Sequence, residues 1–433
     1  MKRSMAAVLG AATAMTLVLA GCSGDDSSDP GSGSKTLTLA GWSLSTTPEF
    51  KTLADGFKAA NPDITVELKE YDAANYDTQM IADLAAGKAP DIYAQKTLKN
   101  FYTYQNGKQL LDVSDVATGL GGKAGGIANY QVDGKTYAIP YRQDSWVLFY
   151  NKALFDKAGL AHPDGSWTWD DYASTAKQLT TKLKAAGSPA LGDYQHIWQS
   201  TVQGFALAQT PGADPQTGDF SYLKPYYQRA LDLQNAGAQV KFGDATTNNL
   251  TYQAQFGKQQ AAMMVMGTWY IATLLSQQAG GDADSFAWGF APAPQPTAST
   301  TGQAGTPLTF ADPTGLGINP KINKDKVATA KDFLAYAASV DGAKALGSIG
   351  ITPADTAAVA DTFFTVKGVP TDAVSKLAFA KHDTKPENPV SKYTTPLQNI
   401  LADLHTAVMS GSKDIDTAIA EAQTRAKNEV LHK

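Results

Sequence analysis

The pattern of apolar and polar residues in the first hundred positions predicts alternating strands and helices. Three short alternating or apolar runs predict strands, at residues 36–40, 64–68 and 90–94. Thr47 as an N-cap and Pro48 at the first helical position predict a helix that ends at Asn61-Pro62. Apolar residues at helical spacing over 76–84 predict a second helix. This order predicts a parallel sheet with right-handed crossovers, so we expect ligands beyond the carboxyl ends of its strands.

The pattern is less regular after residue 100. Residues 130–150 predict a run of strands with a hairpin-type turn at 132–135, and residues 151–290 are mainly helical. Three prolines between positions 292 and 296 mark a linker or a crossing. Apolar positions at helical spacing predict later helices, at residues 327–338, 397–408 and 415–430. We therefore expect an α/β protein of two or three domains.

Composition excludes several classes of protein. Hydrophobic residues make up 43% of the 433 positions, which is enough for large cores and excludes disorder over most of the chain. The formal net charge of −5 gives no broad basic surface for nucleic acid. The single cysteine cannot form an internal disulfide or a cysteine-cluster metal site, and the five histidines lack metal-binding spacing. We expect no metal, cofactor or nucleic-acid partner.

The first segment predicts export and a lipid anchor. Lys2-Arg3 precedes apolar or small residues at 5–19, a run that suits a signal peptide better than a membrane-spanning helix. The run ends in Leu19-Ala20-Gly21-Cys22, which resembles the lipobox of bacterial lipoproteins. The resemblance implies a signal peptide at 1–21 and lipidation of Cys22; an ordinary signal peptide with an incidental cysteine is the alternative. Small and polar residues at 22–35 predict a flexible tether, so we expect the protein at the outer face of the cytoplasmic membrane.

Short blocks along the rest of the chain match a known family. They are Pro90-Asp91-Ile92, Ile139-Pro140-Tyr141, Leu148 to Lys152, Leu154 to Leu160, Pro163, Trp167 to Tyr172, Phe256-Gly257-Lys258, Ala262-Met263-Met264, Gly267-Thr268-Trp269 and Gly317-Ile318-Asn319. From about residue 36 onward the chain resembles a family 1 extracellular solute-binding protein of the carbohydrate class. Such proteins are the capture subunits of bacterial ABC importers.

The resemblance implies an α/β fold with two lobes, of the periplasmic-binding-protein-like type II, and a ligand cleft between the lobes. It places lobe 1 at residues 36–143 and 291–345, and lobe 2 at residues 144–290 and 346–433. It also implies a chain that crosses between the lobes more than once, closure by a hinge, a monomer, and no enzymatic activity. The expected partners are a mono- or oligosaccharide, the ABC permease and, through the lipid anchor, the membrane.

Candidate ligand residues combine position at a strand end, polarity and the match to this family, in which the ligand is a sugar. Its ring face needs aromatic side chains, and its hydroxyls need carboxylate, amide or arginine groups. The candidates at the ends of the first three strands are Trp42, Ser43, Tyr71, Gln95 and Lys96. The candidates in the hinge region and beyond are Tyr141, Arg142, Asp144, Trp198, Trp269 and Asp312.

Each of these candidates also has a structural interpretation. The tryptophans can cover a core, and Arg142 with Asp144 can be a structural ion pair. Asp312 precedes Pro313-Thr314-Gly315, which we expect to be a loop that closes over the cleft. Met263, Met264 and Met266 are expected to form a buried strand.

Three other classes of function stay open from the sequence. A lipid-anchored glycoside hydrolase needs two carboxylates across a sugar cleft, and no recognisable hydrolase motif is present. A binding protein for a peptide, a polyamine or an anion is a second alternative, although the aromatic content favours a ring-bearing ligand. A surface receptor or adhesin that uses the same fold is the third.

Overall fold

The structure is a computed structural model that describes residues 36–432, apart from residues 46, 122–123 and 356–358. The predicted signal peptide, the tether and Cys22 lie outside the described residues. Within the described part of the chain, no helix is both long and apolar enough to cross a membrane.

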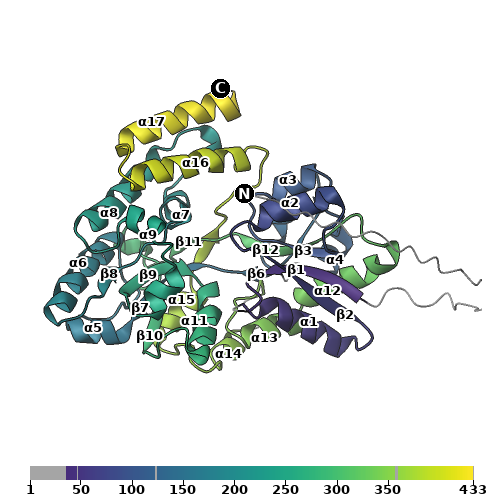
Figure 1. Cartoon of the computed structure of the whole chain (residues 1–433), viewed down its shortest axis with the longest axis horizontal. Coiled ribbons are helices and arrows are strands. Elements are labelled where there is room, and N and C mark those ends of the chain that lie inside the picture. The colour runs from purple at the N-terminus through teal and green to yellow at the C-terminus, as the bar shows by residue number, and fades with distance from the viewer. Residues whose placement is uncertain (1–35, 46, 122–123, 356–358, 433) are drawn as a thin grey trace, which may run out of the picture. The chain divides into compact units, whose positions relative to one another are not determined.

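The first sheet contains the predicted parallel strands (Figure 1). Its order is β2-β1-β3-β12-β6, with β1 at Thr36–Trp42, β2 at Thr65–Tyr71, β3 at Ile92–Gln95, β12 at Pro313–Ile318 and β6 at Ile139–Gln143. β1 is parallel to β2 and β3, whereas β12 is antiparallel to β3 and β6. Leu37 and Leu39 are buried while Thr36 and Thr38 are half-buried, which is the alternation that predicted this strand. The three predicted strands are confirmed.

Short helices and one hairpin complete this lobe. The helices are α1 Glu49–Ala60, α2 Tyr76–Ala86, α3 Phe101–Asn106, α4 Ser114–Leu120, α12 Val327–Ala337 and α13 Val340–Gly347. The predicted turn lies between β4 (Gln131–Val132) and β5 (Lys135–Thr136), where Asp133 and Gly134 both have positive φ. The prediction that Thr47 caps α1 is wrong. The helix begins after Pro48 without a side-chain cap, and the Thr47 amide instead donates to the Ser43 carbonyl.

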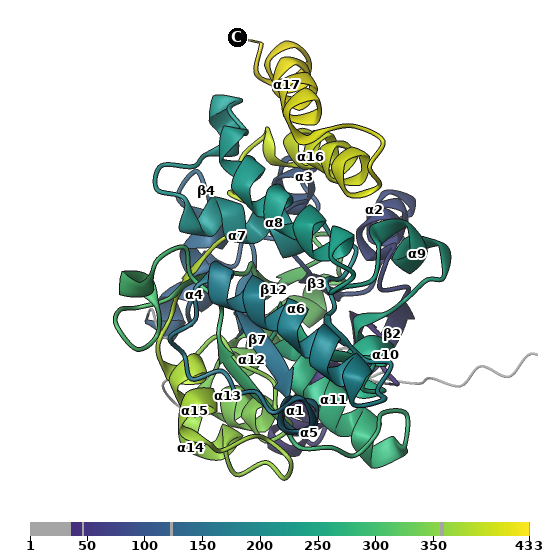
Figure 2. The same cartoon turned by 90° about the vertical axis from the view of Figure 1, so that its left-hand side faces the viewer.

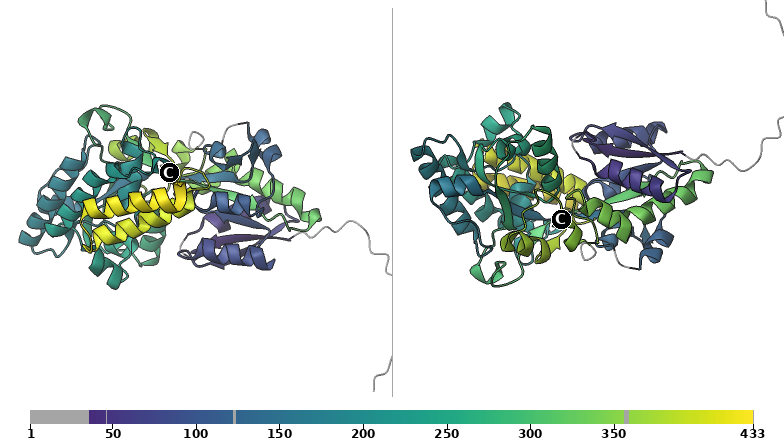
Figure 3. Two further views of the ribbon diagram at one scale, coloured as in Figure 1. Left: turned by 90° about the horizontal axis from the view of Figure 1, so that it is seen from above. Right: turned by 90° about the horizontal axis from the view of Figure 1, so that it is seen from below.

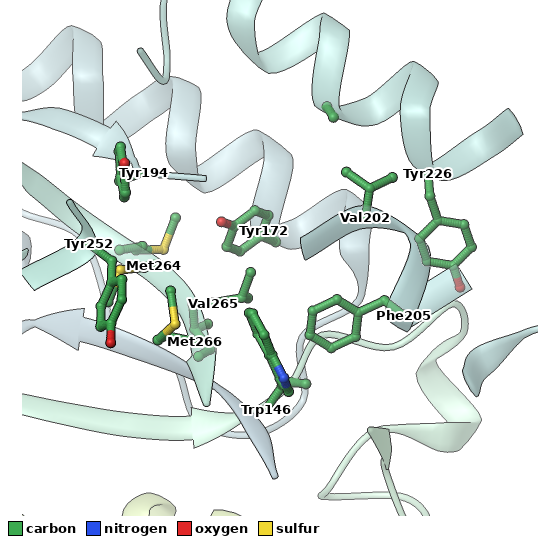
Figure 4. Close-up of a cluster of buried hydrophobic side chains, with 14 of the residues drawn as sticks. Trp146, Tyr172, Tyr194, Val202, Phe205, Tyr226, Tyr252, Met264, Val265 and Met266 are labelled. Carbon is green, nitrogen blue, oxygen red and sulfur yellow. The ribbon is translucent and has the colours of Figure 1, made fainter. Parts of the chain in front are cut away.

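The second sheet has the order β10-β7-β9-β8. Its strands are β10 Trp288–Pro292, β7 Trp146–Asn151, β9 Ala261–Gly267 and β8 Leu191–Asp193. Every residue of β9 is buried, which confirms that its methionines belong to a buried strand. Figure 4 shows Met264 and Met266 packed among aromatic side chains that include Trp146, Phe205 and Tyr172.

Helices surround the second sheet. They are α5 Lys152–Ala158, α6 Trp169–Ala185, α7 Ser200–Gln209, α8 Lys224–Asn235, α9 Phe242–Thr247, α10 Tyr252–Gly257, α11 Trp269–Gly280, α14 Ala360–Phe363, α15 Ala373–Ala380, α16 Thr394–Met409 and α17 Ile415–Arg425. The predicted helices at 397–408 and 415–430 correspond to α16 and α17, and a π-helix at Ala426–Leu431 continues the second of them. Figures 2 and 3 show α16 and α17 as a neighbouring pair that packs beside α8. A small separate ladder joins β11 (Leu308–Phe310) to β13 (Asp383–Lys385).

Two hydrophobic cores define the lobes. Among the described residues, the core of lobe 1 is formed by residues from 37–141 and 316–354. The core of lobe 2 is formed by residues from 146–311 and 363–431. Ala272 of α11 is the exception, because it packs into the core of lobe 1. The chain therefore passes between the cores at 142–145, at 311–315 and after Ala354, which agrees with the expectation of several crossings.

The boundaries of the lobes differ from those predicted at 291 and 346. Residues 291–311 stay with lobe 2, because β10 pairs with β7 as far as Pro292 opposite Val147, and because Phe310 stacks on Trp146 at 4.9 Å between ring centroids. Residues 346–354 stay with lobe 1, because Leu346 and Ile351 are fully buried in its core. The prolines at 292–296 therefore do not mark the crossing.

Candidate functional site

Trp42 and Lys96 lie together where β1 and β3 end. The Trp42 ring is edge-on to Phe50 and Tyr76, with centroids 5.0 and 5.1 Å away, and it is 7% exposed. Lys96 Nζ lies 5.2 Å from the Trp42 ring centroid, and the Arg142 guanidinium carbon lies 6.0 Å from it. Strand direction explains this grouping, since the carboxyl ends of neighbouring parallel strands meet at one edge. The sequence placed Trp42 and Lys96 at the ends of the first and third strands, and the structure brings the two side chains together.

Gln95 has a buried amide group at this edge. The residue is 1% exposed, and neither Oε1 nor Nε2 has a hydrogen-bond partner among the described residues. A buried amide without partners is uncommon and costs free energy, so it calls for an explanation. The neighbouring Lys96 donates from Nζ to the Ala73 carbonyl, and burial lowers the pKa of this ammonium group.

Ser43 and Tyr71 are held by local contacts. Ser43 has a φ of 50°, and its carbonyl accepts the Thr47 amide at 2.8 Å. The Tyr71 hydroxyl donates to Asp83 Oδ2 of α2 at 2.6 Å, and its ring packs on Tyr76. The Tyr71 hydroxyl is thereby committed to Asp83.

Arg142 is the centre of a buried ionic network. Its Nη1 donates to Glu49 Oε2, its Nε lies 2.9 Å from Asp144 Oδ2, and its Nη2 donates to Thr314 Oγ1 at 3.3 Å. The Tyr141 hydroxyl donates to Glu49 Oε1 at 3.2 Å. Burial raises the pKa of both carboxyl groups, and the guanidinium opposes this shift. The structure thus shows that Arg142 and Asp144 form the structural ion pair that was one of their two interpretations.

Glu49 belongs to this network but is not among the candidates from the sequence. It is the first residue of α1 and has no exposed surface. A glutamate in the first turn of a helix is common on surfaces, where it complements the helix dipole. Its contacts with Tyr141 and Arg142, 92 and 93 residues later, distinguish it, so no local pattern could have identified it.

Lobe 2 presents an aromatic group made of Trp198, Tyr252 and Trp269. Trp198 is 41% exposed, and its ring centroid lies 5.6 Å from that of Tyr252. Burial raises the pKa of the Tyr252 hydroxyl to about 12, and the neighbouring Trp269 side chain opposes that shift. His196 lies between Trp198 and Tyr252, with centroids at 4.5 and 5.3 Å, and burial lowers its pKa to about 4, so it is neutral. The structure therefore joins the two predicted tryptophans through Tyr252, which the sequence analysis missed.

Trp269 is held in place from two sides. It is the first residue of α11, and its ring is edge-on to Trp146 at 5.5 Å. Its indole also lies over Gly267, where an added Cβ would be only 1.8–2.2 Å from the ring atoms. Gly267 is thus required for close approach of the ring to the backbone.

Asp312 does not belong to a closing loop, so that prediction is wrong. The residues after it form β12, an interior strand of the first sheet. Its carboxylate accepts the Leu98 amide at 2.9 Å and the Asn388 amide and side chain at 3.0 and 2.6 Å. It therefore joins three distant segments at the second crossing between the lobes.

A hollow of about 450 Å³ in lobe 2 is lined by residues that include Tyr150, Lys152, His162 and Asp372, and by none of the predicted ligand residues. Over the described ranges, no cluster of three or more His, Cys, Asp or Glu side chains could hold a metal ion.

Two α/β lobes joined by three crossings, with aromatic and polar side chains at strand ends near those crossings, define a bilobal binding protein. The chain belongs to the bacterial extracellular solute-binding protein family, whose model matches residues 43–344. Members of this family bind solutes and are not enzymes, which excludes the hydrolase alternative. The predicted periplasmic-binding-protein-like α/β fold is confirmed.

Individual relatives show what similar proteins bind. The structure of a sugar transporter from Rhizobium etli, in an open conformation, matches with a TM-score of 0.73 and 28% identity over 90% of this chain and 98% of that one. The sn-glycerol-3-phosphate-binding periplasmic protein UgpB of Yersinia pestis is 30% identical over 36% of each chain. The melibiose/raffinose/stachyose-binding protein MelE of Bacillus subtilis is 30% identical over 40% of this chain and 39% of its own.

Proposed function

We propose that this protein captures a neutral mono- or oligosaccharide outside the membrane and delivers it to an ABC permease. The ligand would lie between the lobe 1 edge formed by Trp42, Gln95 and Lys96 and the aromatic group of lobe 2. A sugar needs both kinds of surface, because its ring carries C–H faces and its rim carries hydroxyls. A Rhizobium etli relative described as a sugar transporter and the relative MelE support this assignment.

The observation that carries the proposal is the Gln95 amide. Among the described residues its donor and acceptor atoms have no partner, and both are buried at the end of β3, beside Lys96, whose Nζ lies near the Trp42 ring. A hydroxyl both donates and accepts hydrogen bonds, so sugar hydroxyls satisfy an amide on both of its atoms. A ligand without such groups would leave the buried Gln95 amide without hydrogen bonds, and its cost in free energy would remain.

An anionic solute is the second candidate function, and UgpB is the observation in its favour. The charges of the site argue against it. Arg142 is already paired with two carboxylates, Glu49 and Asp144, so its positive charge is compensated. A phosphate group at this edge would depend mainly on Lys96, whose charged form is disfavoured by burial.

A thermal-shift screen of the purified protein tests the proposal. The panel contains mono- and oligosaccharides, glycerol 3-phosphate, amino acids, peptides and polyamines. We expect one class of neutral sugar to raise the melting temperature, because a hundredfold excess over Kd stabilises the native state by about 2.7 kcal/mol. A shift with glycerol 3-phosphate, a peptide or a polyamine alone would contradict the sugar assignment and keep the solute-binding role.

The proposal includes a lipid anchor at Cys22, with localisation at the outer face of the cytoplasmic membrane. Its support is the sequence Leu19-Ala20-Gly21-Cys22 at the end of an apolar run, with the only cysteine of the chain in the lipobox position. Stable anchoring of a binding domain takes two acyl chains, since one chain binds only marginally. Anchoring would keep the loaded protein at a high local concentration near the permease.

Replacing Cys22 tests the anchor. For Cys22→Ala we expect loss of radiolabelled fatty-acid incorporation and release from the membrane fraction, or retention as the uncleaved precursor. Ser23→Ala, one residue later, is the matched control and should be anchored and processed like the wild type. A fully processed Cys22→Ala protein that stays in the membrane fraction would contradict the lipoprotein assignment.

A further inference from the structure

A single hydroxyl group contacts two of the three crossings between the lobes. Thr268 lies between β9 and α11 in lobe 2 and is 2% exposed. Its Oγ1 donates to Asp144 Oδ1 at 2.9 Å and accepts the Ser145 amide at 3.2 Å, and both partners belong to the first crossing. It also accepts a hydrogen bond from Thr352 Oγ1 at 3.1 Å, close to the third crossing.

These contacts use the complete hydrogen-bonding capacity of the hydroxyl, which has one donor and two acceptor positions. The backbone adds to the same junction: the Thr268 amide donates to the Ser145 carbonyl at 2.9 Å. The Gln143 amide donates to the Thr352 carbonyl at 3.2 Å, so the first and third crossings also touch each other directly. The junction is therefore a fixed arrangement rather than a chance contact.

The junction continues into both lobes. On the side of lobe 1, Asp144 pairs with Arg142, which is bound to Glu49. On the side of lobe 2, the Trp269 backbone amide lies close enough to Asp144 to oppose the rise in the pKa of its carboxyl group. Asp144 thus binds Thr268, the residue directly before Trp269 in the chain. A change in the angle between the lobes at 144–145 would act directly on Trp269.

We infer that Thr268 is a positioning residue that couples the orientation of the lobes to the placement of Trp269. It need not touch the ligand. Closure can be driven only by interactions that differ between the open and closed states. Because the Thr268 hydroxyl is shared by two crossings, its hydrogen bonds would differ when the angle between the lobes differs. The part of this inference that concerns ligand affinity rests on the proposed binding function, whereas the part that concerns lobe orientation does not.

The test compares Thr268→Val, which removes the hydroxyl at nearly the same size, with Thr268→Ser, which keeps it. Thr273→Val is the matched control, since Thr273 is buried in α11 and, among the described residues, its hydroxyl donates to the Trp269 carbonyl of the same helix. Dyes on exposed positions 58 and 184 report the distance between the lobes by single-molecule energy transfer in the full chain. The sugar identified by the thermal-shift screen reports affinity.

We expect Thr268→Val to broaden the distance distribution without ligand and to weaken affinity about tenfold, the effect of losing about one hydrogen bond. Thr268→Ser and Thr273→Val should match the wild type in both measurements. Should Thr268→Val fail to fold, Thr352→Val removes one partner of the hydroxyl and should broaden the distribution less. A Thr268→Val or Thr352→Val protein with the wild-type distance distribution would overturn the inference. If no sugar binds, the proposed function fails, and the ligand-free distances still decide the inference.

Discussion

The Arg142→Met variant is expected to lose about 3–5 kcal/mol of unfolding free energy at pH 7, because it leaves two buried carboxylates without their cation. Glu49 and Asp144 are 0% and 3% exposed, so water cannot replace the guanidinium. Urea unfolding without ligand, followed by circular dichroism, measures the difference.

The pH dependence of this variant has a definite sign. Burial already raises the pKa of both carboxyl groups in the wild type, and loss of the guanidinium raises them further. A carboxyl group with a raised pKa in the folded state contributes its full stability below the unfolded pKa and loses it as the pH rises through the folded pKa. The deficit of Arg142→Met should therefore grow from pH 4.5 towards neutrality.

Two further variants make this expectation specific. Lys152→Met also removes a cation from an ion pair, 2.6 Å from Asp372, but both side chains are partly exposed, so its cost should stay below about 1 kcal/mol. Adding Glu49→Gln to Arg142→Met should recover part of the loss, since one buried charge disappears. Equal unfolding free energies for Arg142→Met and Lys152→Met would contradict a buried network at the first crossing.

Trp269→Ala is expected to weaken sugar binding by about 2 kcal/mol or more, roughly thirtyfold, because it removes an aromatic face of lobe 2. Gly267→Ala should have a related effect without removing the indole. Its Cβ would overlap the ring that now lies over Gly267, so the ring must move. Isothermal titration with the sugar found in the screen gives both affinities.

Trp167→Ala is the matched control for Trp269→Ala. Trp167 is also a partly buried tryptophan near a helix start, but its ring packs on Phe155 in lobe 2, at 6.3 Å between centroids. This variant should lower stability and leave affinity within about twofold of the wild type, because large-to-small changes in a core act mainly on folding. Wild-type affinity in Trp269→Ala would remove Trp269 from the ligand site.

Local patterns determined the early sheet, while the class of protein came from the resemblance of short sequence blocks to a known family. The strands at 36–42, 65–71 and 92–95 follow from alternation and short apolar runs, and their parallel order follows from the intervening helices. The buried strand of methionines and the amphipathic helices α16 and α17 follow from the same rule. These features depend on neighbours within a few residues, so they can be read without the fold. The grouping of Trp42 with Lys96 also follows, because parallel strands end at one edge.

Only the tertiary structure decided what depends on residues far apart in the chain. Asp312 looked like part of a loop, but its carboxylate is fixed by Leu98, 214 residues earlier, and by Asn388. The sequence left Arg142 and Asp144 as either ligand contacts or a structural ion pair, and only the structure shows that Arg142 pairs with both Asp144 and the buried Glu49. The boundary between the lobes lies after the predicted residue 291, because Phe310 stacks on Trp146 of lobe 2. Strand and helix periodicity records which face of an element is buried, whereas the partner of a buried charge is set by long-range packing that no local pattern contains.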